Sequence, residues 1–245
     1  MITPCGGSVS EVITTLKSVQ KVSRELPTLD ITVHTIYNNG MQPIEVAGID
    51  GIDVVVGDIN PIASRARARN RVIEEIVDEG GDFLVFIDSG DELLPDALQS
   101  ILELPTEMVL DTDVFICSSN VRTQTSEFSR TNRSIRWVSL INPFYLGSVL
   151  IRSSAIPTAV RFRDGRKEDW KFWHELFEVL NPVKSAWISQ PNYIYNVKSA
   201  ANHAVRKSKL VSSQYLFFRQ FLGNSVLLSL FKTVLHYVVW WFIGF

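Results

Sequence analysis

A run of apolar residues at positions 83–87 ends abruptly in two aspartates, Asp88 and Asp91, separated only by Ser89 and Gly90. The run is short and uninterrupted, which predicts a fully buried strand. Asp88 and Asp91 then lie in a tight turn at its carboxyl end, where open α/β sheets bind their ligands. Two converging carboxylates suit a hard divalent cation, Mg²⁺ or Mn²⁺, whose other positions substrate phosphates fill. The alternative is a turn in which Asp91 caps the next helix.

Helix-like and strand-like segments alternate along most of the chain. Apolar periodicity predicts helices at 8–23, 61–77, 95–102 and 168–180. Ser8 or Ser10 is the expected N-cap of the first. Short β-branched or apolar runs predict strands at 29–37, 52–56, 83–87, 114–118, 148–151, 186–189 and 193–197. The polar residues 120–136 are expected to form a mobile excursion. This alternation favours an α/β fold with a mainly parallel sheet flanked by helices.

Charge and cysteine usage narrow the classes of partner. The formal net charge of the 245 residues is −2, which gives no global field for nucleic acid. Cys5 and Cys117 are far apart and match no metal-ligand spacing, so we expect free thiols in a reducing compartment.

A secretory signal is not expected, because no basic segment precedes a long apolar run at the N-terminus. The first strand is expected to be short, or else to begin upstream of Met1.

The last residues differ in kind from the rest. Residues 226–245 are mostly apolar, although Lys232 and His236 interrupt them. Basic residues precede this run and alternate with aromatic ones: Arg206, Lys207, Lys209 and Arg219. This pattern predicts a membrane-associating helical tail over 201–245, after a domain over 1–200, as an in-plane helix or a single anchor. The alternative is a helix packed on the domain or on a second subunit.

Five segments recur in the order and spacing of one protein family. They are Ile-Thr-Pro at 2–4, Ile-Tyr-Asn-Asn-Gly at 36–40, Arg-Ala-Arg-Ala-Arg-Asn at 65–70, the aspartate motif at 86–95, and the Glu-Asp pair within 165–173. In this order, over about residues 2–198, the chain resembles a family-2 glycosyltransferase of the GT-A fold. The resemblance implies a Rossmann-like α/β domain that moves a sugar from a nucleotide-diphosphate donor, with inversion.

The resemblance also implies which residues bind the donor. These residues are Thr3, Pro4, Asn38, Asn39, Arg65, Arg69, Asn70 and Asp88. Two asparagines stand where the family usually has carboxylates, and an amide also donates hydrogen bonds, which changes the expected nucleotide preference. Gly90 stands where many members have another aspartate. Asp91 is therefore the stronger metal-ligand candidate, and Asp88 acts on the metal, on a metal-bound water or on the ribose. For each arginine the alternative is a solvated helix face.

For catalysis, the resemblance implies that Asp169 is the base that takes the acceptor proton, with Glu168 orienting the acceptor. The alternative is that both acidic residues only complement the helix dipole in its first turn. Trp170 is a candidate for stacking on a sugar, or else a core residue. His203 is expected to be a surface histidine.

These features together predict a metal-dependent inverting glycosyltransferase, with Mn²⁺ or Mg²⁺ as cofactor, at the cytoplasmic face of the cell membrane. The expected partners are a nucleotide-sugar donor, a lipid-linked or oligosaccharide acceptor of surface polysaccharide assembly, and the membrane surface. The chain lacks the Gln/Arg-x-x-Arg-Trp motif of processive synthases, which favours transfer of a single sugar.

Two other functions compete with this prediction. One is a sugar nucleotidyltransferase, disfavoured because residues 5–8 form a short loop and no basic residue precedes Lys17. The other is a catalytically degenerate, membrane-peripheral scaffold that binds a partner glycosyltransferase. Asn38, Asn39 and Gly90 motivate the scaffold, and the aspartates that remain argue against it.

Overall fold

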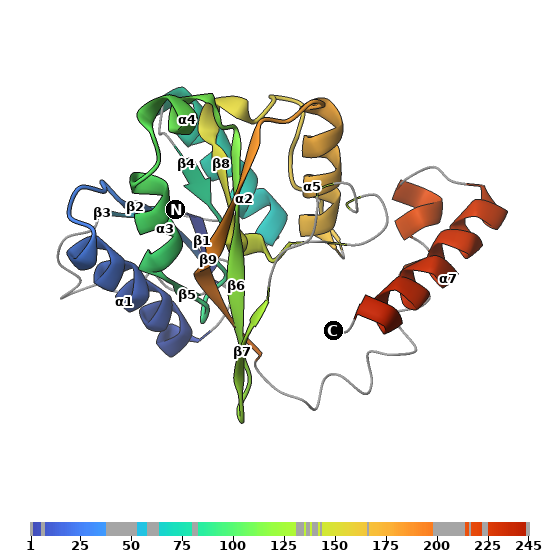
Figure 1. Ribbon diagram of the computed structural model, residues 1–245, viewed down its shortest axis with the longest axis horizontal. Coiled ribbons are helices and arrows are strands. Elements are labelled where there is room, and N and C mark those ends of the chain that lie inside the picture. The colour runs from blue at the N-terminus through green and yellow to red at the C-terminus, as the bar shows by residue number, and fades with distance from the viewer. Residues whose placement is uncertain are drawn as a thin grey trace.

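The computed structural model describes most of the chain. The described residues are 2–5, 8–37, 53–57, 64–79, 83–130, 135, 138, 142, 144–165, 167–197, 214–215, 217–221 and 225–243. Within these residues two sheets carry helices on their faces (Figure 1). The predicted α/β class is confirmed.

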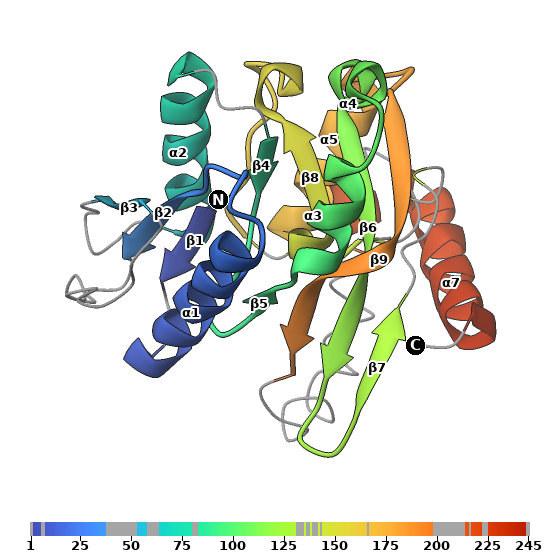
Figure 2. The ribbon, with the colours of Figure 1, turned by 60° about the vertical axis from the view of Figure 1, so that its left-hand side comes forward.

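The N-terminal sheet is parallel. Its order is β1 (Ile2–Cys5), β2 (Thr32–Tyr37) and β3 (Asp53–Gly57). Helix α1 (Val9–Glu25) connects β1 to β2, and α2 (Arg65–Glu79) follows β3 (Figure 2). Ser8 is the N-cap of α1, where its side chain and that of Glu11 form a reciprocal capping box. This hydrogen bonding confirms the predicted start of the first helix.

The central sheet is mixed, whereas the sequence predicted a mainly parallel one. Its order is β4-β8-β6-β9-β5, with β7 added on β6. The strands are β4 (Phe83–Val85), β5 (Glu92–Leu93), β6 (Val114–Arg122), β7 (Glu127–Arg130), β8 (Val149–Arg152) and β9 (Ser185–Asn196). Strand β8 pairs antiparallel with both β4 and β6, and among the described strands of this sheet only β6 and β9 pair in parallel. Local apolar patterns do not encode strand direction, so the sequence could not reveal this.

Two segments differ from their predicted secondary structure. Residues 120–130 are not an excursion, because β6 continues to Arg122 and turns into β7 as a hairpin. Arg122 stabilises this hairpin by binding Glu92 on one side and Glu127 on the other, the latter at 2.7 Å. The two predicted late strands are one strand, β9, whose register on β6 shifts at Ser118. The sequence at 189–192, Ser-Gln-Pro-Asn, is typical of a turn, which is why it was expected to separate two strands.

Helix α5 (Glu168–Val179) covers one face of the central sheet, and α3 (Pro95–Leu102) and α4 (Thr106–Asp111) lie at its other side (Figure 2). Short 3₁₀ turns, η2 (Leu146–Ser148) and η3 (Ser153–Ala155), flank β8. The main core joins α2, α5 and the strands β4, β6 and β8. Phe86 and Phe172 are fully buried in it, and their rings pack edge to face with centroids 5.8 Å apart, which holds α5 against the segment that leads to Asp88.

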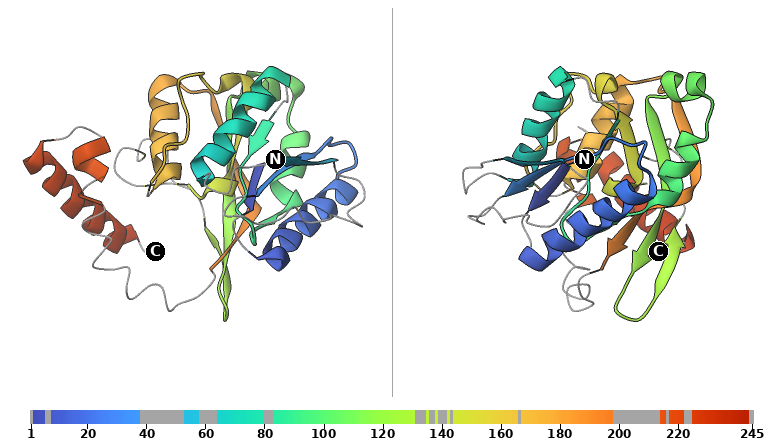
Figure 3. Two further views of the ribbon diagram at one scale, coloured as in Figure 1. Left: turned by 180° about the vertical axis from the view of Figure 1, so that it is seen from behind. Right: turned by 90° about the vertical axis from the view of Figure 1, so that its left-hand side faces the viewer.

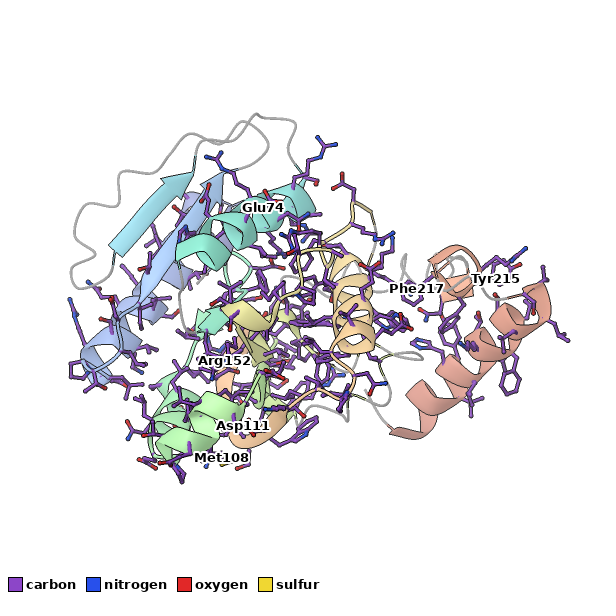
Figure 4. The ribbon with its side chains drawn as sticks, turned by 90° about the horizontal axis from the view of Figure 1, so that it is seen from above. Glu74, Met108, Asp111, Arg152, Tyr215 and Phe217 are labelled. Atoms are coloured by element: carbon purple, nitrogen blue, oxygen red, sulfur yellow. The ribbon has the colours of Figure 1, made fainter. Side chains whose placement is uncertain are left out.

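The C-terminal segment packs beside α5. It contains the π-helical turn η4 (Phe217–Phe221) and α7 (Val226–Ile243), which lie at the edge of the molecule beyond α5 (Figures 1 and 3). Phe217 stacks on Trp170 with ring centroids 4.1 Å apart, and Figure 4 shows it between α5 and α7. None of the described helices has the length and hydropathy that crossing a membrane requires. The predicted boundary near residue 200 falls outside the described residues and stays a prediction.

Candidate active site

The turn after β4 begins where the core ends. Phe86 and Ile87 are fully buried, whereas 38% of the Asp88 side chain is exposed. The strand before them is not fully buried as predicted, because Phe83 and Val85 are half-buried. The amide of Asp91 donates to the carbonyl of Asp88 over 3.0 Å and closes the turn. Gly90 has φ = 94°, a conformation that favours glycine, and its amide donates to the carbonyl of Glu11 in α1. The turn therefore points Asp88 outward and Asp91 inward.

Asp91 is a structural residue in this arrangement. Its side chain is 2% exposed. Oδ2 accepts a hydrogen bond from the Tyr193 hydroxyl, and Oδ1 accepts one from the backbone N–H of Asn196 at 2.9 Å. The Thr15 hydroxyl donates to the Asp91 carbonyl at 2.7 Å, which ties α1 to the same turn. Both carboxylate oxygens thus hold the turn to β9, and burial beside this carboxylate raises the pKa of Tyr193 well above its ordinary value.

Asp88 lies in a cluster of four charged side chains from three elements. Arg69 Nη2 is 2.6 Å from Asp88 Oδ1, and Arg69 Nη1 is 3.5 Å from Glu168 Oε1. Arg65, one helical turn earlier on α2, reaches the same two carboxylates at 3.9 Å and 3.4 Å. Arg69 is 1% exposed, whereas Arg65 is 56% exposed. The structure therefore brings four predicted site residues together, with one arginine inside the cluster and one at its surface.

Asp169 follows Glu168 at the start of α5. Burial, and secondarily the neighbouring charge of Glu168, raises the pKa of Asp169 above its ordinary value. Its Oδ2 accepts a hydrogen bond from the Asn142 amide at 2.6 Å, which fixes the orientation of the carboxylate. A carboxylate with a raised pKa is a better proton acceptor near neutral pH than an ordinary aspartate. This environment suits the general base that the sequence predicted.

The residues on either side of Asp169 are held by the tail. Lys167 adopts the left-handed conformation (φ = 59°) just before α5. Its Nζ lies 5.0 Å from the centre of the Trp170 ring and donates to Gln214, and burial lowers its pKa to about 8. Trp170 is buried under Phe217, so its ring is not available for stacking on a sugar. The core alternative holds for Trp170, because an apolar tail covers it.

The remaining residues that were predicted to bind the donor are not part of the charged cluster around Asp88. The Asn70 amide forms two hydrogen bonds of 2.8 Å with the backbone of Phe162, so it fixes the loop that leads into α5. Thr3 and Pro4 pair with Thr35 and Ile36 across the parallel sheet. Three further predicted residues, Asn38, Asn39 and His203, lie outside the described residues, and their predictions stay untested.

The predicted Mn²⁺ or Mg²⁺ site does not fit this arrangement. Asp91 has both carboxylate oxygens engaged by protein donors, and Gly90 has no side chain to offer. Asp88 is paired with Arg69 and lies next to Arg65, so a divalent cation there would meet two guanidinium groups. Among the described residues, His, Cys, Asp and Glu form no group of three that could hold a metal ion.

Several residues of the site escaped the sequence prediction. Tyr193 and Asn196 hold Asp91, and Asn142 holds Asp169, across more than 25 positions of sequence. Gly147 is one signal that sequence reasoning passed over, since a Cβ there would lie 2.3 Å from the Tyr193 ring. The close approach lets Tyr193 reach Asp91, but only the folded chain reveals the pairing.

No family model and no curated protein sequence matches the chain. Solved structures do match it. The chain is similar to S. aureus TarS, with a TM-score of 0.59 and 16% identity over 88% of this chain. It is also similar to the mannosyltransferase PcManGT from Pyrobaculum calidifontis, solved with GDP-Man and Mn²⁺, with a TM-score of 0.58 and 11% identity over the whole chain.

The chain has the GT-A fold. A third similar structure is glucosyl-3-phosphoglycerate synthase from Mycobacterium tuberculosis, solved with Mg²⁺ and UDP, with a TM-score of 0.51 and 15% identity over 88% of this chain. This chain covers 39% of TarS, 75% of PcManGT and 76% of the synthase. The predicted resemblance to GT-A glycosyltransferases is confirmed as a likeness of fold.

Changing Asp91 should destabilise the protein. Asp91→Ala removes the acceptor of the Tyr193 hydroxyl and the Asn196 amide. Hydrogen bonds to a charged group contribute about 1.5–3 kcal/mol each, so we expect the free energy of unfolding to fall by about 3 kcal/mol or more. Chemical denaturation measures this loss, and Tyr193→Phe should lose less because it removes one donor. An Asp91→Ala protein of unchanged stability would contradict the structural role.

As the base that the sequence predicts, Asp169 should be needed for the rate of sugar transfer and not for the stability of the fold. The raised pKa means that folding disfavours the ionised form, so the carboxylate costs stability as the pH rises from the ordinary pKa through the raised one. We therefore expect Asp169→Asn to melt no lower than the parent at pH 7 and to lose about 10²–10⁴-fold in rate. In the parent, the rate should fall as the pH drops through the raised pKa. Asp164→Asn, in the exposed loop before α5, is the matched control; a fully active Asp169→Asn would exclude the base.

Proposed function

We propose that this chain transfers a single sugar from a nucleotide-diphosphate donor to a hydroxyl acceptor, with inversion. The observation that carries the proposal is the position of Asp169, which lies next to the Asp88–Arg69–Glu168 cluster at one edge of a GT-A fold. A proton acceptor and a set of guanidinium groups are what this reaction needs at a single site.

The described residues support each part of that reaction. The acceptor oxygen forms a bond to the anomeric carbon. At the same time the bond between that carbon and the diphosphate oxygen breaks, and the electron pair of the broken bond stays on the diphosphate oxygen. Asp169 takes the hydroxyl proton, and Asn142 orients its carboxylate for that task. Arg69 holds Glu168 and Asp88 in fixed positions beside it. Asp169 keeps the role of base that the sequence predicts, and the acceptor-orienting role of Glu168 stays a prediction.

A panel of nucleotide sugars tests the proposal. A donor that binds only the native state at about 100 times its Kd stabilises it by about 2.7 kcal/mol, which a thermal shift detects. We expect one donor to raise the melting temperature and to release its nucleoside diphosphate in the presence of a sugar acceptor. A donor that binds but is never turned over would favour the scaffold. Pyrophosphate release from a nucleoside triphosphate and a sugar 1-phosphate would favour the nucleotidyltransferase.

We also propose that the tail binds the cytoplasmic face of an anionic membrane, where a lipid-linked acceptor of surface polysaccharide assembly would be found. Helix α7 turns its apolar side chains outward: Leu227 is 80% exposed, Phe231 61% and Val234 63%, while the polar Ser229 and Thr233 are buried. An exposed apolar face of this kind marks an interaction surface. Residues 201–245 contain five Lys or Arg and no Asp or Glu, which complements an anionic lipid surface.

Vesicle flotation tests the membrane proposal. We expect the protein to float with vesicles that contain phosphatidylglycerol and to remain in solution with phosphatidylcholine alone, because binding needs both apolar burial and charge. The double variant Leu227→Glu/Phe231→Glu should lose flotation. Leu110→Glu, at an exposed leucine of α4, is the matched control. A double variant that instead converts a dimer into a monomer, without any vesicle binding by the parent, would assign the face to a second copy of the chain.

A further inference from the structure

The charges at Asp88 are already balanced by the protein. Arg69 is buried, and its two terminal nitrogens reach Asp88 and Glu168 at 2.6 Å and 3.5 Å. A buried guanidinium that lost these partners would be an unpaired charge away from water, which is strongly unfavourable. Arg69 and Asp88 therefore remain together when a ligand enters, and Asp88 has little charge left to offer a metal ion.

Arg65 differs from Arg69 in what it offers to a ligand. Its guanidinium lies over the same two carboxylates at 3.4 Å and 3.9 Å, distances longer than a good hydrogen bond, and more than half of its side chain is exposed. A guanidinium carries a permanent charge and presents donors in a fork that matches phosphate oxygens. Arg65 is also the first residue of α2, whose first turn contains no acidic residue, and the amino end of a helix favours anions.

We propose that this enzyme binds the diphosphate of its donor without a divalent cation, and that Arg65 supplies the positive charge which the leaving group meets. The inference rests on the proposed function and extends it to the way that charge is balanced. Three features carry it: the inward carboxylate of Asp91, the missing side chain at Gly90, and the guanidinium pair that surrounds Asp88.

In the transfer step, the bond between the anomeric carbon and the diphosphate oxygen breaks, and the electron pair remains on the phosphate. Arg65 donates hydrogen bonds to that oxygen anion as its charge grows. The acceptor oxygen forms the new bond to the anomeric carbon, and its proton goes to Asp169. No oxidant, reductant or metal takes part in the balance of this step.

Nucleotide titration of the full chain tests the inference, with UDP and GDP as probes. We expect calorimetry to give a Kd in excess EDTA within about threefold of the Kd in Mn²⁺. Arg65→Ala should weaken binding at least tenfold in both buffers, a change of about 1.4 kcal/mol. Arg65→Lys keeps the positive charge and loses the forked arrangement of donors, so its Kd should lie between those of the parent and Arg65→Ala.

Arg67→Ala is the matched control, because Arg67 is an exposed arginine of the same helix that pairs with Asp164, away from the cluster. We expect it to bind both nucleotides as the parent does. Unchanged melting temperatures for both alanine variants exclude misfolding, since both side chains are exposed.

The outcomes separate the inference from the proposed function. Binding that needs Mn²⁺ would overturn the metal-free site and leave the glycosyltransferase in place. Binding in EDTA that Arg65→Ala leaves unchanged would overturn the role of Arg65. No binding of UDP, GDP or any nucleotide sugar in either buffer would overturn the proposed function together with the inference.

Discussion

The buried carboxylate of Asp91 is the interaction on which the site depends. It is held by Tyr193 and Asn196 of β9, while Thr15 of α1 binds the backbone of the same turn. Three elements that are distant in sequence therefore meet at one residue. Because Asp91 points inward, the turn must point Asp88 outward. The buried Asp91 thus sets the direction of Asp88, which lies in the charged cluster with Arg69. The cost of burying the Asp91 charge is offset by hydrogen bonds to both of its carboxylate oxygens.

Arg69 connects the turn at Asp88 to the first residue of α5, Glu168. It bridges Asp88 and Glu168 from the inside of the molecule, and Glu168 is adjacent to Asp169 in the chain. The proposed base therefore has a fixed place relative to the proposed phosphate site. The same bridge neutralises Asp88, which is why a divalent cation fits poorly there. The buried guanidinium of Arg69 therefore both fixes the positions of Asp88 and Glu168 and balances the charge of Asp88.

The tail contributes to the site as well as to the surface. Phe217 covers Trp170, and Gln214 binds Lys167, so the first turn of α5 is packed on both sides of Asp169. The opposite face of α7 exposes leucine, phenylalanine and valine to the surroundings. One segment thus packs against the helix of the base and presents the surface that we propose for the membrane.

The sequence by itself determined the local elements and the chemistry available. The run at 83–87 was recognisable from its apolar pattern, whereas the Glu-Asp pair and the arginines of 65–70 stood out through the resemblance to family-2 glycosyltransferases. Tertiary structure alone decided which carboxylate is buried, because Asp91 and Asp88 have the same side chain and differ only in the partners that β9 and α2 bring to them. It also decided that the central sheet is mixed and that Trp170 is covered, since strand direction and long-range packing leave no mark on a local pattern.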